Sequence, residues 1–275
     1  MIKDLVVNLS GGESDVAAAY AISIAKAFNA HLTGIAFVYE PVIPATIMGG
    51  IPTEIIESQR TDSLNWAENA VAAFNRQVAS AGITAVTRTV DASLAGAAES
   101  FGQIARRFDL SVVAQAEQKS TSPADLIIEG AMFQSGRPVI IVPVIQTEGI
   151  KLDRVAIGWD GSRTAARAVA DAMPLLKRAG QVEIVVVFGE NDKTYQTQGA
   201  IMTEHLLRHG VNAEIKRIPA PKVDVQSTLL NYVADSGTNL LVMGAYGHSR
   251  LREFILGGVT RSMLSSMTIP VLMSH

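Results

Sequence analysis

The chain has 275 residues, of which 48% are hydrophobic, and a formal net charge of −3 from 23 basic and 26 acidic residues. This length predicts two domains, and the near balance of charge favours neither nucleic acid nor an anionic membrane as a partner. Because the chain contains no cysteine, disulfides, thiolate metal sites and thiol nucleophiles are excluded.

The N-terminal sequence predicts a soluble cytoplasmic protein. Its short apolar run is interrupted by Asp4 and is followed by the polar stretch "NLSGGESD". This pattern is neither a signal peptide nor a membrane span of about 20 apolar residues. We therefore expect no contact with a membrane.

Short runs of β-branched residues alternate with longer amphipathic segments along the first half of the chain. Such alternation is typical of βαβ units around a parallel sheet. The pattern predicts strands at 3–9, 31–38, 84–90, 110–114 and 138–143, and helices at 13–28, 53–80, 94–107 and 123–134. The predicted fold class is therefore α/β, with a doubly wound parallel sheet.

The same order of elements then begins again. Residues 152–173 repeat the strand, polar turn and alanine-rich helix of residues 2–23, and each copy ends on a proline-led apolar strand. These repeats predict two duplicated domains, at 1–145 and 151–275. Since an apolar edge strand is a poor edge to leave bare, we expect the two terminal strands to pair the domains about a pseudo-two-fold axis. A homodimer is left open.

The segment "MGAYGHSRLREFILGGVTRSM", residues 243–263, concentrates glycines before the last predicted strand. Gly244 and Gly247 follow a predicted strand at 239–244, and Gly257 and Gly258 precede a predicted helix. A helix N-terminus presents unpaired N–H groups and partial positive charge, which suit a phosphate chain. The alternative is that these glycines only end a strand and a short helix.

The glycine spacing resembles a known signature. Gly244, Gly247 and Gly257 have the G-x₂-G-x₉-G spacing of the universal stress protein family, preceded by Val242 and Met243 and followed by a proline-led strand. The resemblance implies a tandem member with a five-stranded sheet of order 3-2-1-4-5 in each domain. It also implies a stress-response or regulatory protein that binds ATP, with or without Mg²⁺, in its C-terminal domain.

The resemblance implies ATP contacts at particular positions of the second domain. Asp160 would accept from the ribose, the backbone of Phe188 would meet the adenine, and the glycines would surround the phosphates. Gly258 stands where relatives commonly have Ser or Thr. The implied nucleotide-binding residues are Gly158, Trp159, Asp160, Phe188, Met243, Gly244, Gly247, Gly257, Gly258, Val259 and Thr260.

Three further residues, His248, Ser249 and Arg250, are expected close to the phosphates. They could stabilise charge or allow weak phosphoryl transfer to a hydroxyl such as that of Ser249, or they could form a solvated turn. Because no Asp-rich motif accompanies them, we expect no efficient ATPase or kinase and assign no catalytic residue. His205 and His209 share a helix face, but the sequence offers no third ligand, so no metal site is expected.

The first domain lacks the glycine pattern. Aligning the sequences of the two halves puts Gln115 at the position of Gly244, Glu117 and Gln118 near that of Gly247, and Ser10 at that of Asp160. We therefore expect a degenerate first domain whose role is to pair with the second.

A different class of function remains open in the first domain. The stretch "LSGGESD", residues 9–15, resembles the "SGGxDS" turn of the adenine-nucleotide α-hydrolase-like superfamily, with Ser and Asp displaced. That resemblance implies an adenylate-forming or ATP-hydrolysing enzyme. The same turn is also a plain helix-capping sequence.

Overall fold

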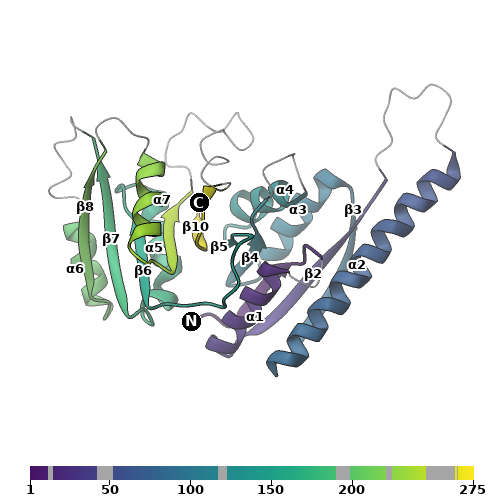
Figure 1. The fold of residues 1–275 in the computed structure, drawn as a ribbon, viewed down its shortest axis with the longest axis horizontal. Helices are drawn as coiled ribbons and strands as arrows, with labels where there is room; N and C mark the ends of the chain where they lie inside the picture. The colour runs from purple at the N-terminus through teal and green to yellow at the C-terminus, as the bar shows by residue number, and fades with distance from the viewer. Residues whose placement is uncertain are drawn as a thin grey trace.

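The computed structural model describes residues 1–11, 15–41, 52–116, 123–189, 199–220, 225–245, 264 and 266–275. The two halves of the chain lie side by side, with strands β5 (Val139–Val142) and β10 (Val271–Ser274) between them (Figure 1). The predicted duplication is therefore visible in the arrangement of the elements.

The strands and helices of the first half follow the predicted order. Its elements are β1 (Asp4–Asn8), α1 (Val16–Phe28), β2 (His31–Tyr39), α2 (Thr53–Ala81), β3 (Ala85–Ala92), α3 (Leu94–Ala105), β4 (Leu110–Ala114), α4 (Pro123–Glu129), η1 (Gly130–Gln134) and β5 (Val139–Val142). The helix predicted from residue 13 starts later, because Asp15 is its N-cap and accepts a hydrogen bond from the backbone N–H of Ala18.

The second half repeats this order with a much shorter second helix. Its elements are β6 (Arg154–Gly158), α5 (Arg163–Leu176), β7 (Gln181–Phe188), α6 (Ala200–Arg208), β8 (Ala213–Pro219), α7 (Val225–Asp235), β9 (Leu240–Gly244) and β10 (Val271–Ser274). The short helix expected after Ser249 and the start of the last helix lie outside the described residues.

The ten strands form one sheet of order β3-β2-β1-β4-β5-β10-β9-β6-β7-β8. Within each half the order is 3-2-1-4-5 and the pairing is parallel, as predicted. Strand order reverses beside β1 in the first half and beside β6 in the second. Ligands of open α/β sheets bind at the carboxyl ends of the strands at such a point.

The junction between the halves is antiparallel and symmetric. Leu272 of β10 lies opposite Ile140 of β5, its own counterpart in the repeat, with Val271 opposite Ile141 on one side and Met273 opposite Val139 on the other. The pseudo-two-fold axis therefore passes through the pairing of β5 with β10. This confirms the prediction that the terminal strands pair the two halves.

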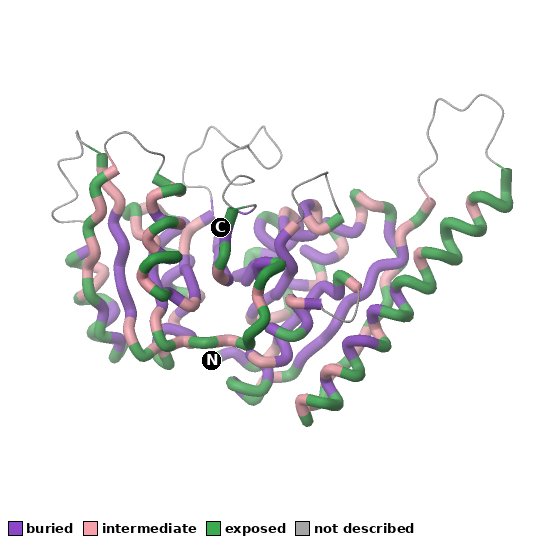
Figure 2. Tube along the Cα trace, in the orientation of Figure 1, coloured by how far each residue is buried: buried purple, intermediate pink, exposed green. Residues whose placement is uncertain are grey.

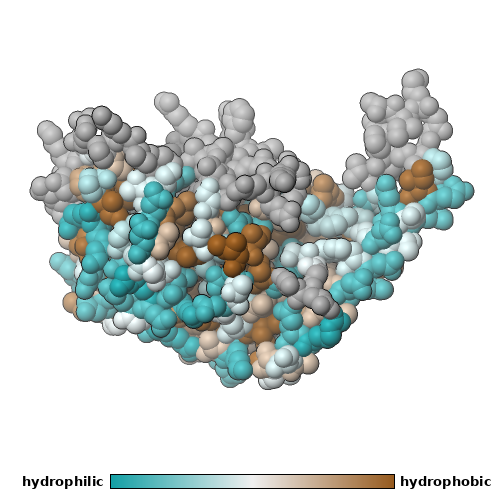
Figure 3. Space-filling view, viewed as in Figure 1, coloured by the Kyte–Doolittle hydropathy of each residue, from teal (hydrophilic) through white to brown (hydrophobic). Residues whose placement is uncertain are grey.

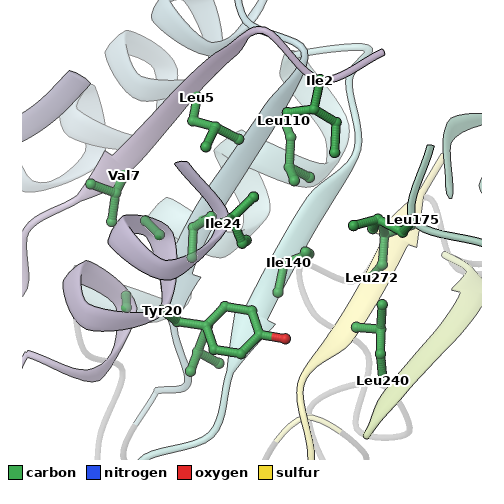
Figure 4. Packing of buried hydrophobic residues seen from close by; sticks show 14 of the residues in the cluster. Ile2, Leu5, Val7, Tyr20, Ile24, Leu110, Ile140, Leu175, Leu240 and Leu272 are labelled. Carbon is green, nitrogen blue, oxygen red and sulfur yellow. The ribbon is translucent and has the colours of Figure 1, made fainter. Parts of the chain in front are cut away.

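Two apolar layers cover the faces of the sheet. One packs the strands against α1, α2, α5 and α6, and the other packs them against α3, α4, η1 and α7. Figure 2 shows the strands buried between these layers. Figure 4 shows the first layer continuing across the junction, where Ile140 faces Leu272 and Leu240 of the second half. The halves thus share a core.

Helix α2 is unusual in its length and exposure. It spans 29 residues, yet its buried side chains, from Ala67 to Val78, all belong to its second half. Its first turns extend beyond the sheet (Figure 1). Apolar burial therefore anchors only about half of the turns of this helix.

The helix predicted at 123–134 changes geometry partway. It is α-helical to Glu129 and a π-helix over Gly130–Gln134. A Cβ on Gly130 would meet the backbone carbonyl of Ala98, and a Cβ on Gly102 would come 2.7 Å from the carbonyl oxygen of Gly130. The glycines let η1 approach α3 more closely than side chains would permit.

The outer surface is mainly hydrophilic on the face shown in Figure 3, with a small hydrophobic patch at the junction of the halves. Among the described helices, none is both long and apolar enough to cross a membrane.

Candidate functional site

The ends of three neighbouring strands define the candidate site in the second half. Strand β6 ends at Gly158, between β7, which ends at Phe188, and β9, which ends at Gly244. Gly158 lies opposite Met243 in the register of β6 and β9. The predicted site residues that the structure describes therefore lie at the ends of neighbouring strands.

Gly158 has no side chain, which allows α7 to pack closely against the end of β6. A Cβ at this position would lie 3.0 Å from Cδ2 of Leu229 on α7 and 3.5 Å from Cβ of Met243. Leu229 is buried, and Gly158 and Met243 are half-buried. A side chain on Gly158 would thus fill the space beside α7 at the strand end.

Asp160 is exposed in the turn between β6 and α5. Its Oδ1 accepts a hydrogen bond of 2.9 Å from the backbone N–H of Ser162, and Gly161 adopts a φ of +74°. Ser162 is the N-cap of α5, and its Oγ accepts from the backbone N–H of Ala165 at 3.1 Å. This turn holds a carboxylate at the mouth of the site, beside a helix N-terminus.

Gly244 is required by packing at the end of β9. A Cβ there would lie 2.5 Å from the backbone nitrogen of Ala165 and 2.6 Å from the carbonyl carbon of Thr164. Because both are backbone atoms in the first turn of α5, neither can move aside cheaply. The sequence predicted that this glycine serves a turn and a ligand; the structure shows in addition that it seats α5 against β9.

Trp159 and Phe188 have backbone partners of their own. The N–H of Trp159 donates to the carbonyl of Val185 at 2.9 Å, and its half-buried side chain packs against the layer that contains α5 and α6. The carbonyl of Phe188 accepts from the N–H of Ala220 at 2.8 Å. The structure therefore favours packing as the role of the Trp159 side chain.

The remaining predicted site residues lie outside the described residues. They are Gly247, His248, Ser249, Arg250, Gly257, Gly258, Val259 and Thr260. Their placement in the site remains a prediction from the sequence.

The strand register corrects the comparison with the first half. Ala114 pairs with the last residue of β5 as Gly244 pairs with the last residue of β10, so Ala114, and not Gln115, corresponds to Gly244. Gln115 corresponds instead to Ala245. The alignment by sequence was wrong by one residue because it lacked the strand pairing.

The same register also relates the turn that follows β1 to the turn that follows β6. Asn8 corresponds to Gly158 and Ser10 to Asp160. Asn8 is only 7% exposed, and its Oδ1 has no hydrogen-bond partner in the part of the chain that the structure describes. At the end of β1, therefore, a buried polar side chain stands at the position where the second half has Gly158.

Asp15 shows what the "LSGGESD" turn does in the first half. Its Oδ1 accepts from the N–H of Ala18 at 3.0 Å and its Oδ2 from the N–H of Ser10 at 2.7 Å. Burial raises the pKa of this carboxyl above its ordinary value, although these backbone hydrogen bonds oppose the shift. In its described part, the turn acts as a helix cap; Gly12, Glu13 and Ser14 lie outside the described residues.

An aromatic ring also covers the turn that follows β1 in the first half. A Cβ on Gly11, whose φ is +84°, would meet the indole of Trp66 at 2.6 Å. Trp66 belongs to α2, which is far longer than its counterpart α6 in the second half. The long helix therefore places a ring over the turn of the first half.

The two histidines considered as metal ligands lie side by side at the end of α6. The rings of His205 and His209 lie 4.6 Å apart between centroids. Among the described residues, no group of three or more His, Asp or Glu side chains is arranged to hold a metal ion.

Gln115 is the residue that sequence reasoning misread. Its side chain is buried and donates from Nε2 to the carbonyl oxygen of Leu264 at 2.5 Å, across the junction of the halves. The signal in the sequence was a lone amide directly after a fully apolar strand end, where a buried polar side chain needs a specific partner.

Comparisons with known proteins relate the chain to one family. Residues 151–275 match the model of the universal stress protein family. The universal stress protein Slr1230 of Synechocystis sp. is 25% identical over 139 residues, or 50% of this chain. The match covers 46% of that relative, so the chain spans about half of its length.

Solved structures share the complete two-half fold. A universal stress protein from Archaeoglobus fulgidus is 17% identical with a TM-score of 0.73, covering 98% of this chain and 96% of that one. A putative universal stress protein from Pseudomonas aeruginosa is 13% identical with a TM-score of 0.60, covering 99% and 93%. Both likenesses establish the fold. Residues 151–275 are thus a universal stress protein domain by the family match, and the whole chain shares its two-half fold with solved universal stress proteins.

Proposed function

We propose that the chain is a stress-response or regulatory protein that binds ATP at the carboxyl edge of its second half. The observation that carries this proposal is the meeting of Gly158, Asp160 and Gly244 at neighbouring strand ends, beside the N-terminus of α5. Its support from the sequence is the glycine signature that continues to Gly257 and Gly258. A cytoplasmic location stays a prediction.

Different residues of the second half would bind the ribose and the phosphates of ATP. The exposed carboxylate of Asp160 can accept hydrogen bonds from ribose hydroxyls, and such charge-assisted bonds are stronger than neutral ones. The glycines from Gly247 to Gly258 would let backbone N–H groups approach the phosphates without net positive charge on the chain. ATP then acts as a bound ligand, with or without Mg²⁺.

The enzyme alternative receives less support. Its motif lies in the first half, where both carboxylate oxygens of Asp15 already accept backbone hydrogen bonds in the cap of α1. The described residues offer no separate feature that favours adenylate formation. Release of AMP and pyrophosphate from ATP would reverse this preference.

Calorimetric titration of ATP into the full chain and its variants tests the proposal. Gly258→Val should abolish or greatly weaken binding by placing a branched side chain among the phosphates. Gly258→Ser, which restores the hydroxyl common in relatives, should preserve or tighten binding by about 0.5–1.5 kcal/mol.

A matched pair of variants tests which half holds the site. Asp160→Asn keeps an oxygen that can accept from Ser162 but removes the charge, and should weaken ATP binding by about 1–2 kcal/mol. Ser10→Ala, at the equivalent place in the first half, should leave affinity unchanged. The proposal fails if wild type binds no ATP, or if none of the variants at Gly258 and Asp160 changes affinity.

A further inference from the structure

The side chain of Gln115 joins the two halves of the protein from a buried position. It is 7% exposed and lies directly after β4, in the first half. Its Nε2 donates to the carbonyl oxygens of Leu264 at 2.5 Å and Met267 at 3.5 Å, both in the second half. Its Oε1 accepts from the backbone N–H of Val144 at 3.1 Å. One amide thus connects β4, the chain after β5 and the chain before β10.

The partners of Gln115 occupy a particular place in the second half. In the sequence, Leu264 comes four residues after Thr260, the last residue of the proposed phosphate-binding segment. Leu264 and Met267 are themselves buried, at 5% and 3% exposure. Leu264 and Met267 thus lie in the sequence between this segment and β10, which begins at Val271, and Gln115 of the first half donates to the carbonyls of both.

The second half has no amide side chain at the position of Gln115. The counterpart of Gln115 in the second half is Ala245, whose methyl group cannot donate a hydrogen bond. The residues equivalent to Leu264 and Met267 in the first half are Met132 and Ser135, by the register of β5 and β10. The Oγ of Ser135 donates to the carbonyl of Ala131, within its own half. The symmetric pairing of β5 with β10 therefore carries an asymmetric polar contact.

The hydrogen bonds of Gln115 define one position of the chain at Leu264. A buried carbonyl that loses its donor must find another partner or move towards water. Loss of the amide would therefore release the polypeptide on the C-terminal side of the proposed phosphate-binding segment. A less defined position must be ordered when a ligand binds, and the cost of ordering lowers affinity.

We propose that Gln115 is a positioning residue for the nucleotide site of the second half, so that the first half sets the affinity of that site. This proposal rests on the proposed binding of ATP. The first half, in this account, contributes a buried amide that supports the site of the second half.

The variant Gln115→Met tests this proposal in the full chain. Methionine has nearly the same volume but neither the donor nor the acceptor of the amide. We expect ATP affinity, measured by calorimetry, to fall about tenfold, within the usual range of coupling between two sites. The variant Gln115→Asn, one methylene shorter, should change affinity in the same direction, and serves if the methionine variant does not fold.

The matched control is Ser111→Ala. Ser111 is a buried residue of the same strand, 1% exposed, and its Oγ donates at 3.2 Å to the carbonyl of Pro138 within the first half. It also loses a buried hydrogen bond, but one that does not cross the junction. Its ATP affinity should stay within about twofold of wild type, even where its thermal stability falls as much as that of the Gln115 variants.

The outcomes separate the two proposals. If wild type binds ATP and the folded Gln115 variants bind it equally well, the role of Gln115 is refuted while the proposed function stands. Equal loss of affinity in Ser111→Ala and the Gln115 variants would also refute it, since any weakened first half would then suffice. If wild type binds no ATP, the proposed function fails and this inference fails with it.

Discussion

The two halves share one fold but differ at the carboxyl ends of equivalent strands. Where the second half has Gly158 and Gly244, the first has Asn8 and Ala114. Beside these positions, Gln115 of the first half corresponds to Ala245. The first half thus has side chains at two strand ends where the second half has glycine. The difference teaches that the two halves keep strand order and core more strictly than they keep the residues at the carboxyl ends of the strands.

The junction differs from these edges because it stays symmetric. Both halves contribute a fully buried apolar strand, and Leu272 lies opposite Ile140. Apolar pairing needs only shape and a shared edge, which both copies inherit. A binding site needs particular groups at particular places, so a few substitutions suffice to remove it.

The largest expected effect comes from exchanging the residues at the end of the fourth strand. Gly244→Ala should lower the free energy of unfolding by about 2–3 kcal/mol, because the added Cβ meets backbone atoms of Thr164 and Ala165. The reverse change in the first half, Ala114→Gly, should cost only about 0.5–1 kcal/mol from backbone entropy and a lost methyl group. Urea denaturation of the two variants measures the difference.

Gly189→Ala is the control for this comparison. A Cβ on Gly189 would meet nothing within 4 Å, and its φ is not positive. Its free energy of unfolding should therefore remain within about 0.5 kcal/mol of wild type. If Gly244→Ala were as mild as this control, the close packing of α5 on β9 would be wrong.

A smaller effect is expected at a buried acid that only the second half contains. Glu183 of β7, 1% exposed, accepts a hydrogen bond of 2.9 Å from the hydroxyl of Tyr232 on α7, whereas the first half has Thr33 at the equivalent place. Desolvation by burial, with a contribution from Glu183, raises the pKa of Tyr232 to about 12. Tyr232→Phe should cost about 1–2 kcal/mol at neutral pH, since it removes a donor from a buried carboxylate.

The pH dependence of this pair has a defined sign. A tyrosine whose pKa rises from 10.0 to about 12 on folding adds stability that is complete below pH 10 and is lost as the pH rises towards 12. The difference in free energy of unfolding between wild type and Tyr232→Phe should therefore shrink over that interval. A constant difference from pH 9 to 12 would show that the hydroxyl of Tyr232 ionises normally.

Most of the fold could be predicted from the sequence because its signals are local and repeated. The alternation of apolar runs and helical stretches located the described elements of the first half to within a few residues, and the proline-led strands identified the junction. The π-helix at Gly130–Gln134 could not be predicted, because it depends on contact with Ala98 and Gly102, far away in the sequence.

The candidate site was predictable only in part. Asp160 and Gly244 stand at strand ends that the sequence marks, and the structure brings them to the same edge. The role of Gln115 could not be predicted, because its partner Leu264 is 149 residues away and its alignment depended on strand register. The packing role of Gly244 likewise required the position of α5.

The central claim is that one half holds a nucleotide site and the other does not. Calorimetric titration of ATP into the full wild-type chain tests it most directly through the stoichiometry. We predict one ATP per chain, lost in Gly258→Val and unaffected in Ser10→Ala. Two equivalent sites per chain would contradict the account, because the first half would then bind ATP despite Asn8, Ser10 and Ala114.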